Sequence, residues 1–168
     1  RDWTLPLQTD DLAGLPDFVL QAAKAAGQEK GLDGPVVTLS RSLIVPFLEF
    51  SDRRDLRETA YKAWAARGAN GGETDNREIV RETLQLRQEQ AALLGYKSFA
   101  EFKLETQMAK TPARVRDLLM QVWHPAKARA EADGAILTQM MAEDGLNGPL
   151  MASDWRYYAQ RRRKVDHD

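Results

Sequence analysis

Residues 75–95 read DNREIVRETLQLRQEQAALLG, and both ends of this stretch carry the residues that begin and end helices. Asp75 or Asn76 can cap a first turn, because a short polar side chain accepts hydrogen bonds from free backbone N–H groups. Gly95 can end the helix, because glycine readily adopts the left-handed conformation beyond a last turn. Apolar residues recur between these ends at helical spacing: Ile79, Val80, Leu84, Leu86, Ala91, Leu93 and Leu94. The stretch predicts a helix that is buried on more than one side.

Two further helices are predicted downstream of this stretch. Ser98 begins a short helix that continues through about Ala109. Thr111 and Pro112 begin a long helix, because an N-cap residue is followed there by proline at the first helical position. The apolar residues of the long helix keep helical spacing as far as the region of Gly145.

Proline interrupts the long helix, and a last helix follows it. Pro125 removes one backbone hydrogen bond, so we expect a kink near this residue, with His124 packed at the kink. Ser153 and Asp154 begin the last helix, which is rich in aromatic and basic side chains.

The segments before residue 68 predict two helices and at most two short strands. Residues 16–29 form a helix with proline in its first turn, and residues 51–67 form another with Ser51 as N-cap. Residues 36–39 are β-branched and bounded by turn residues, which favours a strand, and residues 3–7 alternate loosely. The sequence therefore predicts a mainly α fold, a multi-helix segment with at most one or two short strands.

Composition limits the classes of protein to which the chain can belong. With 168 residues, of which 43% are hydrophobic, one compact unit is expected. The chain has 24 Lys and Arg against 25 Asp and Glu, so no global field attracts nucleic acid or anionic lipid. No apolar run approaches the roughly 20 residues that span a bilayer, so no membrane partner is expected. The lack of cysteine excludes disulfides and thiolate zinc sites and fits a reducing compartment, so we expect a cytoplasmic protein.

The two ends of the chain suggest that it is a piece of a longer polypeptide. It begins at Arg1 without an initiator methionine, and it ends in the charged stretch 161–168 without an obvious stop signal. We expect residues 1–168 to be one helical fragment of a larger protein.

The histidines do not predict a zinc site within this chain. Catalytic zinc normally takes three protein ligands, often including two histidines four positions apart on a helix. The two histidines, His124 and His167, lie 43 positions apart. The terminal Asp166-His167-Asp168 could hold a metal loosely, but a solvated tail is the expected structure.

Two acidic pairs are the other candidates for chemistry. Glu78 with Glu82, and Glu101 with Glu105, are spaced four apart and could line a general acid/base cleft. Basic residues stand near both pairs, so solvated helix faces are the expected structure. The chain contains neither a G-x-S-x-G nucleophile elbow nor a phosphate-binding loop.

The last helix combines aromatic rings with positive charge. Trp155, Tyr157 and Tyr158 stand beside Arg156 and the basic run 161–164. Such a combination can bind single-stranded nucleic acid, which is the alternative hypothesis of a free-standing interaction module. We expect instead that Trp155 and Tyr158, three positions apart, face the core while the cations face water.

A series of short motifs stands in a characteristic order along residues 12–158. The motifs are Pro46-Phe47-Leu48, Arg57-Glu58, Ala63-Trp64, Asp75 to Val80, Leu93 to Tyr96, Ser98 to Phe102, Met108 to Pro112, Val122-Trp123 and Asp154-Trp155-x-Tyr157-Tyr158. Together they resemble the thimet-oligopeptidase family of zinc metallopeptidases, and most of all its bacterial peptidyl-dipeptidase (dipeptidyl carboxypeptidase) branch.

The resemblance implies a two-lobed, mainly helical zincin whose channel admits short peptides. In the family, zinc bound by an H-E-x-x-H motif activates a water and the motif glutamate is the general base. This chain lacks the H-E-x-x-H motif. The resemblance therefore places the chain upstream of the catalytic core, as scaffold or channel wall. No catalytic or metal residue is assigned to it, its substrate-binding residues stay unknown, and zinc is expected only in the full-length parent. Release of C-terminal dipeptides is expected, with an oligoendopeptidase as the alternative; the oligomeric state is open.

Overall fold

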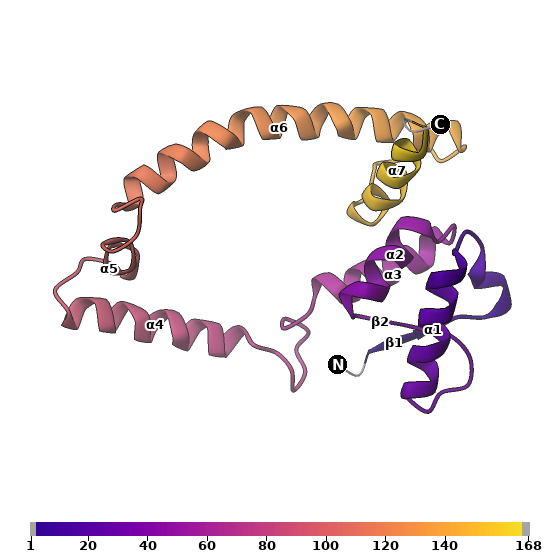
Figure 1. Cartoon of the computed structure of the whole chain (residues 1–168), viewed down its shortest axis with the longest axis horizontal. Helices are drawn as coiled ribbons and strands as arrows, with labels where there is room; N and C mark the ends of the chain where they lie inside the picture. The colour runs from indigo at the N-terminus through magenta and orange to yellow at the C-terminus, as the bar shows by residue number, and fades with distance from the viewer. Residues whose placement is uncertain (1–2, 166–168) are drawn as a thin grey trace. The chain divides into compact units, whose positions relative to one another are not determined.

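The computed structural model describes residues 3–165, and these residues form a mainly helical protein (Figure 1). Within this range lie seven α-helices, one short 3-10 helix and two three-residue strands, as the predicted fold class requires. The chain divides into two compact units where one was expected. Among the described residues, the first unit comprises 3–67 together with 133–165, and the second comprises Gly68–Ala132.

The first unit holds the strands and most of the helices. Its elements are β1 (Thr4–Pro6), the 3-10 helix (Thr9–Leu12), α1 (Asp17–Glu29), β2 (Val36–Thr38), α2 (Arg41–Phe50), α3 (Arg54–Ala65), the last turns of α6 (Pro112–Glu143) and α7 (Ala152–Val165). The strands pair antiparallel, with Leu5 opposite Val37. Both predicted strands and the helix predicted at residues 16–29 are confirmed.

Helix α2 was not predicted from the sequence, and Pro46 lies inside it. Proline removes one hydrogen bond from a helix interior. Burial offsets this loss, since one face of α2 carries four side chains that are at most 4% exposed: Leu43, Ile44, Phe47 and Leu48. Packing has therefore overridden a local signal against the helix.

Ser51 ends α2 and does not begin the next helix. Helix α3 starts at Arg54 with Arg53 as its N-cap, two residues later than the predicted N-cap implied. The Ser51 hydroxyl accepts a hydrogen bond from the backbone N–H of Arg53 at 3.3 Å, so the side chain still stabilises the turn between the two helices.

The core of the first unit brings helices and strands together. Its fully buried members include Ala23 of α1, Val37 of β2, Phe47 of α2 and Ala60 of α3. A smaller cluster of Leu137, Met141 and Tyr158 packs the end of α6 against α7. Each element of this unit thus buries an apolar face against another.

The second unit consists of α4 (Arg77–Leu93), α5 (Phe99–Leu104) and the first turns of α6. The N-caps predicted for α5 and α6 are confirmed: Ser98 accepts from the Glu101 N–H at 3.2 Å and Thr111 from the Arg114 N–H at 3.3 Å. Helix α5 is shorter than predicted, and α6 is a continuous helix through Pro125.

The predicted burial of the α4 stripe is wrong for this chain. Ala91 is buried, but Leu84 is 58% exposed and Leu93 is 88% exposed. The reason is that the element packed on α4 in this unit, α5, has six residues and cannot cover a helix of 17. His124 on α6 is also exposed, so its predicted packing at a kink is wrong.

No helix between residues 3 and 165 combines the length and apolar character needed to cross a bilayer.

Replacing Leu48 by Ala is expected to lower the free energy of unfolding by about 2 to 5 kcal/mol, because the side chain is fully buried and leaves a cavity. Leu32→Ala in the same unit, where the side chain is 42% exposed, should cost less than about 1 kcal/mol. Urea unfolding followed by circular dichroism measures both. Equal losses would contradict the described core.

Candidate functional site

The carboxylate of Asp154, in the first turn of α7, is completely buried. Arg54 of α3 donates two parallel hydrogen bonds to this carboxylate, from Nε at 3.0 Å and from Nη2 at 2.9 Å. Arg57, one turn further along α3, adds a bond from Nη2 at 3.3 Å. The backbone N–H of Met151 donates to the second carboxylate oxygen at 3.1 Å. Two guanidinium groups of α3 therefore hold the start of α7.

The surroundings of Asp154 keep its carboxylate charged. Burial by itself would raise the pKa of this carboxyl group, since the charged form loses its hydration. The hydrogen bonds from Arg54, from the Met151 N–H and from Arg57 outweigh burial and lower the pKa of Asp154 below its ordinary value. Asp154 is thus ionised in the folded protein at neutral pH and forms ion pairs with Arg54 and Arg57.

The guanidinium group of Arg57 connects three helices. Its side chain is 1% exposed, and its Nη1 donates to the backbone carbonyl of Ser51 at the end of α2, at 2.6 Å. Its Cζ lies 4.0 Å from the centre of the Tyr157 ring of α7. Among the described residues, Arg57 Nε has no hydrogen-bond partner. Arg57 therefore joins α2, α3 and α7 at one buried point.

The two tyrosines of α7 bond to carboxylates on either side. Tyr157 donates to Asp52 at 2.8 Å, and Tyr158 donates to Asp144 at 3.1 Å. Burial, and then the hydrogen bond to Asp144, raise the pKa of Tyr158 to about 12. Both phenols are therefore protonated donors near neutral pH and fix the rotation of α7.

The predicted inward face of α7 is half correct. Tyr158 is 1% exposed, as expected, but Trp155 is 37% exposed. The indole ring of Trp155 lies against α6, where a Cβ added to Gly134 would stand 3.4 Å from it. Trp155 is more exposed than predicted because the face of α7 that packs on α3 is the one that carries Asp154.

Carboxylates neutralise part of the basic run. Arg161 forms an ion pair with Asp144, and Arg162 forms one with Asp133 at 2.9 Å. These contacts favour a structural role for both arginines over a role in binding nucleic acid.

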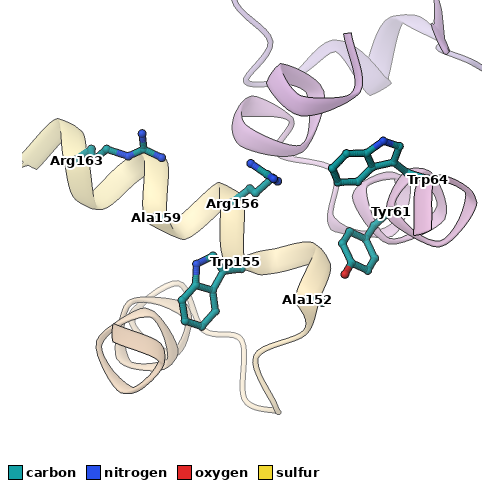
Figure 2. Close-up of a pocket in the computed structure, with 7 residues that line it drawn as sticks. All are labelled: Tyr61, Trp64, Ala152, Trp155, Arg156, Ala159 and Arg163. Atoms are coloured by element: carbon teal, nitrogen blue, oxygen red, sulfur yellow. The ribbon is translucent and has the colours of Figure 1, made fainter. Parts of the chain in front are cut away.

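A cleft of about 500 Å³ lies between α3 and α7 (Figure 2). Arg156 reaches from α7 toward Trp64 of α3, with its Cζ 5.6 Å from the ring centre. The residues that line the cleft are Tyr61, Trp64, Ala152, Trp155, Arg156, Ala159 and Arg163. This lining carries two guanidinium groups and three aromatic rings but no carboxylate.

The acidic pairs are occupied in ordinary surface contacts. Glu78 forms an ion pair with Arg81 at 2.9 Å, and Glu82 is exposed. Glu101 accepts from the backbone N–H of Lys97 at 3.1 Å, and Glu105 accepts from the Tyr96 hydroxyl. The structure brings neither pair into a cleft.

The described residues do not fit a zinc site. His124 is exposed on α6, and Asp166, His167 and Asp168 lie outside the described residues. Within residues 3–165, no three His, Cys, Asp or Glu side chains are grouped so that they could hold a metal ion. We therefore derive no catalytic step from these side chains.

The comparison with known proteins identifies the family. The sequence profile described as Peptidase family M3 matches residues 47–168. The chain therefore belongs to peptidase family M3, the metallopeptidase family of thimet oligopeptidase, as the sequence motifs predicted.

Individual relatives cover most of the chain, while the chain covers a small part of each. Oligopeptidase A of Escherichia coli is 36% identical over 169 aligned positions, and the match covers 96% of this chain and 25% of the relative. Dipeptidyl carboxypeptidase of Escherichia coli is 30% identical over 160 aligned positions, and the match covers 94% of this chain and 24% of the relative. A probable cytosolic oligopeptidase A of Arabidopsis thaliana is 36% identical over 127 aligned positions, and the match covers 69% of this chain and 18% of the relative.

These matches show how much of a family member the chain spans and which kind of family member it resembles more. The chain spans about a quarter of the length of the two bacterial relatives. Identity to oligopeptidase A exceeds identity to dipeptidyl carboxypeptidase, which is the reverse of the expected order.

The replacement Asp154→Asn should destabilise the first unit by about 3 to 5 kcal/mol at pH 7, because it leaves buried guanidinium charge without a counter-ion. Asp33→Asn, at an exposed aspartate, is the matched control and should cost less than about 0.5 kcal/mol.

The same variant has an expected pH dependence. A carboxyl group whose pKa is lower in the folded state stabilises the fold above its ordinary pKa of 3.8, and this contribution is lost as the pH falls through the folded-state pKa. The difference in unfolding free energy between wild type and Asp154→Asn should therefore shrink below about pH 4. Urea unfolding between pH 3 and 7 measures it; a difference that is constant with pH would show that Asp154 does not act as a charge.

Proposed function

We propose that this chain is a helical fragment of a longer zinc metallopeptidase that hydrolyses short peptides. The observation that carries the proposal is the family match over residues 47–168, in a chain that spans about a quarter of its bacterial relatives. The relatives named oligopeptidase support short peptides as the substrate class. The alternative of a free-standing interaction module loses support, because two arginines of the basic run have carboxylate partners.

The role proposed for the chain is that of scaffold or channel wall. The described residues offer no metal site, so the zinc ligands belong, in this proposal, to a further part of the enzyme. Apolar side chains on α4, at its C-cap and on α6 support the existence of such a part. Those more than half exposed are Ile79, Val80, Leu84, Leu86, Leu93, Leu94, Leu118, Leu119, Val122 and Trp123. Large apolar side chains exposed in such number on a helix often mark an interface.

Two cleavage specificities have support. The higher identity to oligopeptidase A favours a general oligopeptidase, which does not require a free C-terminus. The similarity to dipeptidyl carboxypeptidase over 94% of the chain keeps the release of C-terminal dipeptides as the second candidate. A cytosolic location is part of the proposal and is supported by the name of the Arabidopsis relative.

The chain alone is expected to retain no stoichiometric zinc and to cleave no peptide, while the longer enzyme should cleave short peptides and lose activity to a chelator. Elemental analysis after dialysis and a quenched-peptide assay test both. Mass spectrometry of products from matched acid and amide peptides then separates the two specificities, because only an exopeptidase that binds the terminal carboxylate should lose kcat/KM on amidation. A longer enzyme inactive on every short peptide would overturn the proposal.

The substitution Leu84→Asp should change the stability of this chain by less than about 0.5 kcal/mol, because the side chain is 58% exposed. In the longer enzyme the same substitution should cost at least about 2 kcal/mol, since it would bury a charge in an apolar interface. Gln85→Asp, at an exposed polar position of the same helix, is the control. An unchanged melting temperature of the longer enzyme would show that this face of α4 stays in water.

A further inference from the structure

The cleft between α3 and α7 differs from the rest of the first unit in its unbalanced charge. Arg54, Arg57, Arg161 and Arg162 each form an ion pair with an aspartate. Among residues 3–165, neither Arg156 nor Arg163 has an ion-pair partner. Both line the cleft, whose lining contains no carboxylate, and Arg156 points toward Trp64 (Figure 2). Two uncompensated guanidinium groups in one cleft are suited to an anionic ligand, because arginine binds carboxylates in a planar, two-pronged geometry.

The spacing along α7 gives the cleft two charged ends and an apolar middle. Arg156 and Arg163 are seven positions apart, so their backbones lie about 10 Å apart on the same side of the helix. Ala152 and Ala159 have the same spacing and present only methyl groups, which leaves the space open. On the other wall Trp64 offers an aromatic face, over which Arg156 already lies (Figure 2).

We infer that this cleft binds short acidic peptides, by two carboxylates about 10 Å apart with an apolar or aromatic side chain between them. Three residues of extended chain span about 10 Å, so acidic residues at positions one and four of a peptide match Arg156 and Arg163. The side chain between them packs on Trp64 and Tyr61. The inference rests on the proposed function in its choice of ligand, since short peptides are the substrates proposed for the enzyme.

The surrounding charges favour a peptide over single-stranded nucleic acid. A nucleic-acid strand carries a negative phosphate at every nucleotide and needs a continuous basic track. Beside the cleft, Asp133 and Asp144 neutralise Arg162 and Arg161, so the positive charge is confined to two points. A ligand with two separate carboxylates fits this distribution.

Isothermal titration calorimetry on the full chain tests the inference. The probe is an N-acetylated, C-amidated tetrapeptide with glutamate at both ends and phenylalanine second. We expect saturable one-to-one binding, and a loss of about tenfold in affinity in Arg156→Ala and in Arg163→Ala. Ala159→Leu, which fills the cleft without changing charge, should weaken binding to a similar extent. Arg41→Ala, at an exposed arginine of α2, is the control and should bind as wild type.

Several results would overturn the inference. They are no saturable binding, binding of the matched glutamine peptide with equal affinity, and a loss in Arg41→Ala as large as in Arg156→Ala. Tighter, Arg156-dependent binding of an eight-nucleotide single strand would also overturn it, in favour of nucleic acid. Because the readout is binding and not cleavage, its failure leaves the proposed peptidase function intact, whereas a longer enzyme without zinc-dependent hydrolysis would overturn the function separately.

Discussion

The buried carboxylate of Asp154 constrains the arrangement of the first unit. Its removal from water is unfavourable unless the charge is paired with good geometry, and the two parallel bonds from Arg54 supply that geometry. Arg57 adds a second cation that also bonds to the end of α2. Because donor and acceptor residues lie about 100 positions apart in the chain, the first turn of α7 has to lie on α3 for either charge to be satisfied.

The rotation of α7 follows from this anchor. With Asp154 held against α3, Tyr157 stacks on Arg57 and reaches Asp52, and Tyr158 enters the cluster formed by the end of α6. The same rotation directs Arg156 toward Trp64, while the exposed Trp155 lies against α6. One buried ion pair therefore determines which side chains of α7 enter the core and which line the cleft with α3.

Local signals in the sequence predicted much of the fold. Short polar caps marked the starts of α5 and α6, and a β-branched run marked β2, because these preferences act within a few residues. Helix α2 was not predicted. Its Pro46 is a local signal against a helix, and the burial of one face of α2 outweighs that signal. The pairing of Asp154 with Arg54 and Arg57 could not be predicted either. Asp154 was recognised as a helix start, but no periodicity connects it to residues 100 positions earlier.

The wide apolar stripe of α4 shows what apolar periodicity in a sequence predicts and what it leaves open. Periodicity reports that a helix face is suited to burial, and it does not report what covers that face. In the first unit, α2 carries such a face and buries it fully against its neighbours. In the second unit, α4 carries one of similar width and only Ala91 of it is buried. The same sequence rule is thus satisfied in the first unit and left unsatisfied in the second, where the exposed face of α4 has the apolar character of an interface.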